Sequence, residues 1–216
     1  MQTFSLEREF TNNSISENEM QQYTEGKYRI EIFKDENINV SSTDNLNQYD
    51  LDYIDKSDYQ PSTVIGIKLY INEKQLNSAV IGATGGGTGI GENSTIIEYD
   101  RILICCSDSI FCLSIPNLAL LWRRQADEAT CFEIFKYQDS YIVHGELNIS
   151  RLNKNGEILW QQSGADIFTT LDGKDDFKLT ENFILATDWE YRKYKFYYDG
   201  IVAETTDKTK KQWWKL

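Results

Sequence analysis

The chain has 216 residues, of which 40% are hydrophobic and 13% aromatic, a composition that excludes an intrinsically disordered polypeptide. Its 22 Lys and Arg residues stand against 34 Asp and Glu residues, which gives a formal net charge of −12. Because sequence-independent affinity for nucleic acid comes from Lys and Arg on phosphates, this excess of acid argues against a nucleic-acid partner and favours a basic protein partner.

The first ten residues predict a cytoplasmic protein. Glu7, Arg8 and Glu9 stand where a signal peptide needs an apolar segment. No apolar run approaches the roughly 20 residues that a membrane-spanning helix requires, so we expect no membrane partner. The sequence does not indicate the oligomeric state.

The first quarter of the chain carries two thirds of the excess negative charge. Residues 1–60 hold 13 acidic and 5 basic residues, a net charge of 5 − 13 = −8. We expect a short helix at Ser16 to Tyr23, where Ser16 can cap and Glu19 follows three residues later. A strand is predicted at Tyr28 to Phe33, and the Asp-, Asn- and Ser-rich segment Ser41 to Gln60 favours a long, solvated surface loop.

An acidic docking surface for a cationic partner is the functional interpretation of that loop, because clustered charge of one sign steers association. The residues assigned to this surface are Asp44, Asp50, Asp52, Asp55 and Asp58.

Two apolar segments follow, at Val64 to Ile71 and at Ala79 to Ala83, and they predict strands on either side of a longer hairpin loop. The Gly-rich stretch Gly82 to Gly91 then resembles a phosphate-binding loop in composition only. It lacks the Lys and Ser or Thr of such a loop, and a strand rather than a helix follows it. We expect a connection between sheets, although its glycines leave room for an anion or a partner backbone to approach.

The second half of the chain repeats a pattern of about four short strands. The second strands of successive units begin at Ile102, Tyr141 and Phe183, which are 39 and 42 residues apart. Later in each unit comes a further hairpin, and two of these hairpins turn at Asn155-Gly156 and Asp199-Gly200, the pairs that tolerate the positive φ angles of a two-residue turn. A period near 40 without helical segments is the sequence form of propeller blades.

The segment Lys154-Asn155-Gly156-Glu157-Ile158-Leu159-Trp160 carries a family resemblance. A strand, an Asn-Gly turn and a strand ending in Trp resemble quinoprotein-type β-propeller blades, and Trp122 occupies the equivalent place 38 residues before Trp160. The first unit departs from the pattern with Pro116-Asn117-Leu118 at the turn, and the third has Glu204 in place of Trp. The resemblance covers about 110 residues and implies architecture only, since no position matches a cofactor-binding motif.

We therefore predict a mainly β protein of repeated antiparallel meanders, either propeller-like or an open stack of sheets, with few or no helices. Residues 1–60 form an acidic N-terminal segment with one strand and a long loop, and residues 61–216 form the repeat body. The units lie near 96–132, 133–176 and 177–205, and both parts belong to one continuous domain.

The sequence offers little reactive chemistry, and we expect neither a cofactor nor a metal. The four cysteines, Cys105, Cys106, Cys112 and Cys131, lie in strand-like segments and are expected to be reduced core residues. The single histidine, His144, is expected at a strand end, bonded to a neighbour. A carboxylate pair for acid–base cleavage of a glycan could come from Glu146, Asp166 and Asp188, which lie near strand ends.

The sequence is compatible with three functions. Because it contains no recognisable set of catalytic residues, we place a binding function before an enzymatic one. The first is a non-catalytic, acidic, cytoplasmic binding protein, in its concrete form an immunity-like inhibitor of a basic toxin. The second is a carboxylate-dependent hydrolase that acts on a glycan. The third is a structural module of a larger assembly, which predicts exposed apolar edges.

Overall fold

The structure is a computed structural model that describes residues 20–38, 42, 44–54, 60–171, 173 and 176–206. All regular elements in these ranges are β-strands, arranged in four sheets that do not close into a barrel. The prediction of a mainly β protein built from repeated meanders is therefore confirmed. The described part of the chain contains no helix that is long and apolar enough to cross a membrane.

Three of the sheets are four-stranded antiparallel meanders, with their strands in sequence order. Sheet B consists of β6 (Thr95–Glu98), β7 (Arg101–Cys106), β8 (Ser109–Ser114) and β9 (Leu120–Gln125). Sheet C consists of β10 (Cys131–Tyr137), β11 (Ser140–Gly145), β12 (Asn148–Asn153) and β13 (Ile158–Ser163). Sheet D consists of β14 (Phe177–Leu179), β15 (Phe183–Thr187), β16 (Lys193–Tyr197) and β17 (Val202–Thr206).

Sheet A has a different topology. Its strands are β1 (Met20–Glu25), β2 (Tyr28–Lys34), β3 (Leu51–Ile54), β4 (Thr63–Ile71) and β5 (Lys74–Ala83). They lie in the order β1-β2-β4-β5-β3, and β3 pairs with β5 in parallel while the other neighbours are antiparallel. Sheet A thus contains three strands from before residue 60 and two from after it, so the N-terminal segment and the repeat body share one sheet.

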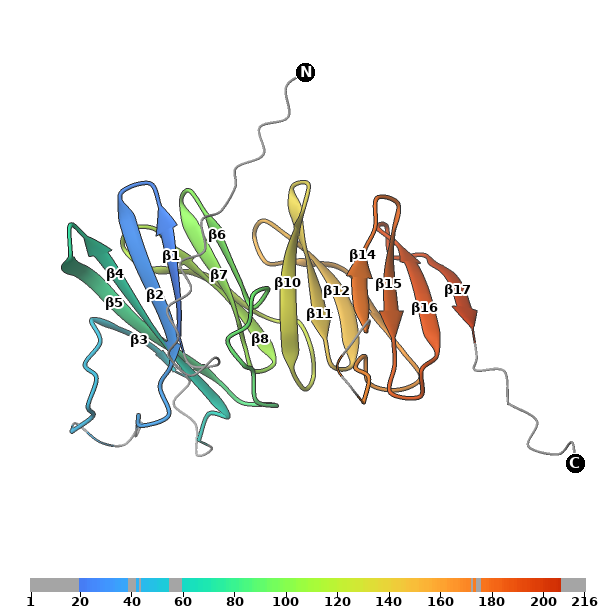
Figure 1. Ribbon diagram of the computed structural model, residues 1–216, viewed down its shortest axis with the longest axis horizontal. Helices are drawn as coiled ribbons and strands as arrows, with labels where there is room; N and C mark the ends of the chain where they lie inside the picture. The colour runs from blue at the N-terminus through green and yellow to red at the C-terminus, as the bar shows by residue number, and fades with distance from the viewer. Residues whose placement is uncertain are drawn as a thin grey trace, which may run out of the picture.

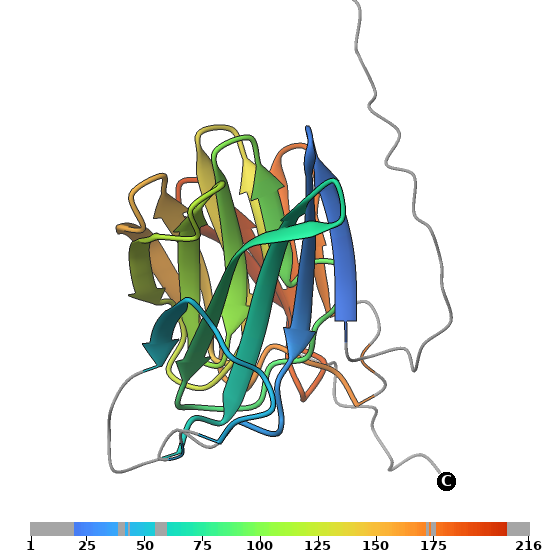
Figure 2. The ribbon, with the colours of Figure 1, turned by 90° about the vertical axis from the view of Figure 1, so that its left-hand side faces the viewer.

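The four sheets stand face to face in chain order, with sheets A and D at opposite ends of the long axis (Figure 1). Figure 2, which looks along the stack from sheet A, shows the sheets one behind another. Because successive side chains of a strand point to opposite faces, each inner sheet contributes to two cores. Cys106 lies in the core between sheets A and B, whereas its neighbour Cys105 lies in the core between sheets B and C.

A recurring aromatic contact joins each sheet to the next. Trp122 in β9 packs on Gly156 of the β12–β13 turn and donates its indole N–H to Lys154 O (3.0 Å). Trp160 in β13 makes the same contact with Gly200 of the β16–β17 turn and donates to Tyr198 O (2.9 Å). The shared geometry explains why both turns need glycine: a Cβ on Gly200 would lie 2.6 Å from Cγ of Trp160.

The junction between sheets A and B uses a tyrosine in this role. Tyr53 in β3 accepts a hydrogen bond from Leu120 N and donates one to Leu118 O, both at 3.1 Å. The turn that it contacts is the Pro116-Asn117-Leu118 turn that departs from the Gly-containing pattern. In sheet D the strand position equivalent to Trp160 is occupied by Glu204, which pairs with Lys195. In both sheets this pair lies next to a shift in the register between the third and fourth strands.

Several predicted boundaries are wrong in the N-terminal part. Residues 16–19 of the expected helix lie outside the described ranges, and Met20 to Tyr23 belong to strand β1, which pairs with β2 along its whole length. The longer loop expected between the next two strands is a two-residue turn, Asn72-Glu73, with both φ angles positive. The solvated loop expected at Ser41 to Gln60 contains β3, because the edge of β5 supplies backbone partners that the sequence pattern does not reveal.

Candidate functional site

The two ends of the strands carry different connections. At one end, which we call the hairpin end, the described part of the chain makes only turns within a sheet. At the other, which we call the loop end, it also crosses from sheet to sheet (Figure 1, lower edge). The described residues of the loop end are 35–38, 60–62, 84–94, 107–108, 126–130, 146–147, 164–171, 173, 176 and 188–192.

Backbone hydrogen bonds link the segments of the loop end to one another. The bonds run from Gly86 N to Ala129 O (2.8 Å), from Glu146 N to Thr130 O (2.7 Å), from Phe168 N to Glu146 O (2.7 Å) and from Trp189 N to Ile167 O (2.9 Å). Because each bond satisfies polar groups that a lone loop would leave to water, the segments form one connected surface across sheets B, C and D.

This surface is strongly acidic. Its described residues include eleven acids and one base: Asp35, Glu36, Glu92, Asp108, Asp127, Glu128, Glu146, Asp166, Asp176, Asp188 and Glu190, with Arg192. The described turns of the hairpin end hold six acids and two bases: Glu73, Asp100, Asp139, Glu157, Glu181 and Asp199, with Lys27 and Lys154. The described loop end therefore has the more negative net charge, although four of its acids, Asp35, Asp108, Asp127 and Asp188, are buried.

Some of these acids hold the loops rather than face solvent. Asp127 is 2% exposed, and its carboxylate accepts four backbone N–H groups, from Ala129, Thr130, Leu147 and Asn148, at 2.7 to 3.1 Å. Burial raises its pKa, and the four backbone donors act in the opposite direction. Asp127 thus ties the crossing from sheet B to sheet C onto the β11–β12 turn.

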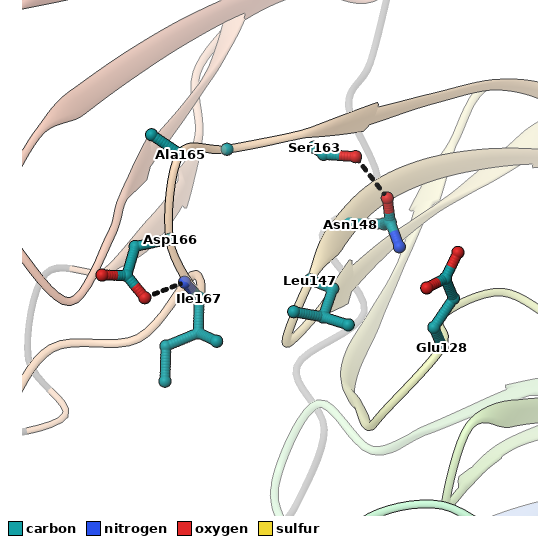
Figure 3. Close-up of a pocket in the computed structure, with 8 residues that line it drawn as sticks. Glu128, Leu147, Asn148, Ser163, Ala165, Asp166 and Ile167 are labelled. Carbon is teal, nitrogen blue, oxygen red and sulfur yellow. Dashed lines mark hydrogen bonds between the residues drawn. The ribbon is translucent and has the colours of Figure 1, made fainter.

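A pocket of about 300 Å³ opens between the two crossings that flank sheet C (Figure 3). Its lining residues are Glu128, Leu147, Asn148, Ser163, Gly164, Ala165, Asp166 and Ile167. Glu128 and Asp166 lie on opposite sides of the pocket, with Leu147 between them (Figure 3). The pocket therefore combines two carboxylates with an apolar surface.

The acidic residues predicted to form a docking surface lie elsewhere. Asp44, Asp50 and Asp52 are exposed near sheet A, and Asp55 and Asp58 lie outside the described residues. Asp50 accepts hydrogen bonds from Ser78 N and Ser78 Oγ, both at 2.8 Å, and so fastens the start of β3 to β5.

The carboxylates considered for acid–base chemistry are engaged in the fold. Asp188 is fully buried and accepts hydrogen bonds from Arg192 N, Arg192 Nε and Tyr194 Oη, at 2.7 to 2.9 Å. Glu146 accepts the Thr130 hydroxyl at 2.7 Å. Asp166 caps Ile167 N at 2.9 Å, and its carboxylate also lies 3.7 Å from Arg192. Of the three, Asp166 alone lines the pocket.

The histidine is at a strand end and bonded, as the sequence predicts. His144 is the penultimate residue of β11 and is almost fully buried, with Nδ1 2.9 Å from a Glu133 carboxylate oxygen and Nε2 2.8 Å from Phe168 O. Its ring stacks on Phe177 at 4.4 Å, so it joins sheets C and D.

The four cysteines are reduced and buried, which confirms the prediction. Burial raises the pKa of Cys106 and of Cys112 to about 12, so neither thiol ionises at neutral pH. Among the described residues, no group of three or more His, Cys, Asp or Glu side chains is arranged to hold a metal.

The Gly-rich stretch is a connection between sheets A and B whose close approaches require glycine. A Cβ on Gly85 would lie 2.6 Å from Ala129 O. Thr88 is buried within the stretch and bonds to Thr63 and to the carbonyl of Ser107. Its glycines thus let this segment reach the crossing from sheet B to sheet C.

Sequence reasoning missed the pocket and the role of Asp127. One signal was present: Ala126-Asp127 recurs as Ala165-Asp166 after 39 residues, which is the repeat period. Each pair follows the last strand of a unit, so a repeat alignment places both acids in equivalent crossings. Glu128 has no counterpart in the next unit, and only the packing of the two crossings brings it opposite Asp166 (Figure 3).

No protein-family model matches the chain, and no curated protein matches it. Solved structures that resemble it include the AfRom2 CNH domain, with 11% identity and a TM-score of 0.49, covering 94% of this chain and 61% of the other. A computationally designed protein, Ika8, has 7% identity and a TM-score of 0.50, covering 86% of this chain and 60% of the other. BamB from Moraxella catarrhalis, a β-propeller, has 14% identity and a TM-score of 0.47, covering 87% of this chain and 52% of the other.

At these identities the likeness concerns the fold alone. The chain spans 52 to 61% of the length of these three structures.

Proposed function

We propose that this protein is a non-catalytic binding protein whose loop end docks on a cationic surface of a partner protein. The observation that carries the proposal is the charge of the described loop end, where seven acids that are not buried stand against one base. Charge of one sign on one face speeds encounter with an oppositely charged partner and disfavours partners of like charge.

The geometry of the loop end supports a binding role over a catalytic one. The crossings are bonded to one another and to buried Asp127 and Asp188, so the acidic surface is held before a partner arrives. Such a surface loses little conformational freedom on binding, which favours affinity. The three carboxylates considered for glycan cleavage instead serve as acceptors within the fold.

In its concrete form the proposal is an immunity-like inhibitor that occludes a basic toxin in the cytoplasm. A toxin that acts on an anionic substrate presents a cationic surface, and an acidic protein that covers this surface blocks access. The resemblance to quinoprotein-type blades concerns the architecture and does not bear on this function.

The experiment compares two matched triple variants of the full chain. The first replaces Glu92, Glu128 and Glu190 of the loop end with Gln, and the control replaces Glu73, Glu157 and Glu181 of the hairpin end. All six side chains are exposed, so each variant removes three surface charges with little effect on stability. The partner is captured from the native lysate with wild-type protein, identified and purified, and its association rate is then measured against ionic strength.

We expect the loop-end variant to lower the association rate by about tenfold at low salt, and the hairpin-end variant by about twofold, since steering falls with distance from the interface. The wild-type rate should fall steeply as salt rises. A rate that ignores ionic strength, or that depends on the hairpin end instead, would overturn the proposal.

A further inference from the structure

The pocket between the two crossings has a feature that surface charge does not explain. Asn148 is 5% exposed, and its backbone N–H is fixed on Asp127 at 2.8 Å. Its side-chain Oδ1 accepts the Ser163 hydroxyl at 2.9 Å. The amide Nδ2 makes no hydrogen bond to any described residue, and Figure 3 shows it on the side of the pocket that carries Glu128.

Among the described residues, the buried side-chain N and O atoms without a partner are Arg29 Nε and Thr95 Oγ1, so Asn148 Nδ2 reaches the open pocket and is available to an acceptor on a ligand. The carboxylate of Glu128 is likewise without a hydrogen bond or ion pair among the described residues. Asp166, on the other side, is partly neutralised by Ile167 N and by Arg192 at 3.7 Å. The pocket therefore offers one uncompensated carboxylate and one uncompensated N–H donor.

Leu147, Ala165 and Ile167 give the pocket its apolar lining, with Leu147 beside Asn148 and with Ile167 on the side of Asp166 (Figure 3). A lysine or arginine residue offers a complement to each of these: a cationic head for the carboxylate, an aliphatic stem for the apolar lining and a backbone carbonyl that accepts a hydrogen bond from the amide. The cavity of about 300 Å³ is at the small end of ligand pockets, which suits one side chain rather than a cofactor.

We propose that this pocket receives one lysine or arginine residue of the partner as an anchor. Glu128 binds the cationic head, Leu147 packs on the stem, and Asn148 Nδ2 donates to a backbone carbonyl of the partner beside the bound head. This inference rests on the proposed function, because it names the chemistry by which the loop end holds a cationic protein. A buried anchor of this kind carries a large share of the energy of an interface.

The test uses small peptide mimics and ¹⁵N–¹H correlation spectra of the full chain at low ionic strength. The probes are Nα-acetyl-arginine N-methylamide and Nα-acetyl-lysine N-methylamide, and Nα-acetyl-norleucine N-methylamide serves as the uncharged control. We expect saturable, millimolar binding of at least one cationic probe, with shifts at the Asn148 side-chain amide and at residues 163–167. The control should bind at least fivefold more weakly.

Two single variants assign the effect to the pocket. Glu128→Gln should weaken binding of the cationic probe by about tenfold, the size expected when a charge-assisted hydrogen bond is lost. Glu92→Gln, which removes the same charge elsewhere on the loop end, should weaken it by less than twofold. Absence of saturable shifts in the pocket with either cationic probe, or equal losses in the two variants, would overturn the anchor.

The two proposals fail separately. If the mimics do not bind but the loop-end triple variant still slows association with the whole partner, the anchor is wrong and the acidic docking surface stands. If the mimics bind the pocket but partner association ignores the loop-end charges, the anchor site stands as a cation pocket and the proposed function is wrong.

Discussion

The two end sheets of the stack differ in their outer faces: that of sheet A is covered by another part of the chain, whereas that of sheet D is exposed. On sheet A the side chains of Ile54, Val64 and Val80 form a small core with Ile38 and Tyr49, which come from the chain between β2 and β3. On sheet D the outer face carries exposed Leu185 and Tyr197 among three lysines: Lys178, Lys193 and Lys195.

The cover on sheet A is held by polar contacts as well as by packing. Tyr49 Oη and Asn47 Nδ2 donate to Asp35 at 2.6 and 3.1 Å, and Lys68 donates to Asn47 Oδ1 at 3.2 Å. On sheet D the lysines themselves cover apolar groups, since Lys195 Nζ lies 4.2 Å from the ring centroid of Phe183. Terminal repeats need a polar outer face, and this chain meets the need with a folded loop at one end and with lysine side chains at the other.

The largest expected effect comes from loosening sheet D from sheet C. Gly200→Ala places a methyl group 2.6 Å from Cγ of Trp160 in a turn with φ of +91°. Gly26→Ala introduces only the smaller strain of a left-handed residue, at φ of +58° in the β1–β2 turn, with no atom within 4 Å. We expect losses in the free energy of unfolding of about 3 and about 1 kcal/mol respectively, measured by urea denaturation. Equal losses would show that the aromatic contact does not attach sheet D.

The contrast between the two outer faces is tested directly by truncating one side chain on each. Val80 is 2% exposed under the cover of sheet A, whereas Leu185 is 36% exposed on sheet D. We expect Val80→Ala to lower the free energy of unfolding by about 2 kcal/mol and Leu185→Ala by less than about 1 kcal/mol. The same urea measurement applies, and a greater loss at Leu185 would mean that its face is covered in solution.

A smaller effect is expected from the hydrogen bond that closes the cover. Tyr49→Phe removes a donor from Asp35, which is 5% exposed, and should cost about 1 kcal/mol of unfolding free energy. Burial and the Asp35 carboxylate both raise the pKa of Tyr49, so ultraviolet titration of the wild type should show Tyr49, together with Tyr141, among the tyrosines that ionise only on unfolding, and Tyr49→Phe should lower their number by one. Tyr99, at 87% exposed, provides the control, and Tyr99→Phe should leave the stability unchanged.

The smallest effect concerns the pH dependence of the middle of the stack. Burial raises the pKa of Glu133, but hydrogen bonds from His144 and Asn93 outweigh it, so the folded-state pKa lies below the ordinary value of 4.5. A carboxyl with a lowered folded pKa stabilises the protein above its unfolded pKa, and this stabilisation is lost as pH falls through the folded value.

Glu133→Gln should therefore flatten the decline of the urea midpoint between about pH 5 and pH 3, where that loss occurs in the wild type. At neutral pH the variant should be somewhat less stable. An unchanged acid slope would mean that Glu133 does not contribute to it.

The regular parts of the fold were predictable because local signals agree there. Asn155-Gly156 and Asp199-Gly200 specify turns, and alternation at Cys105-Cys106 specifies faces, so sheets B, C and D follow from short stretches of sequence. The N-terminal part was less predictable, since β1 and β3 are strands only because β2 and β5 offer edges to pair with. The pocket was beyond prediction because Glu128 and Asp166 come from two separate crossings and Asn148 from the start of β12.

The sequence by itself determined the negative charge, the β-strands of the repeats and the period that stacks them, because composition, alternation and turn chemistry act over a few residues. The tertiary structure alone decided which acids face solvent and which serve as buried acceptors, as the contrast of Glu128 with Asp127 shows. The reason is physical: charge is a property of the residue, whereas exposure and hydrogen-bond partners depend on chain segments that meet only after the sheets have packed.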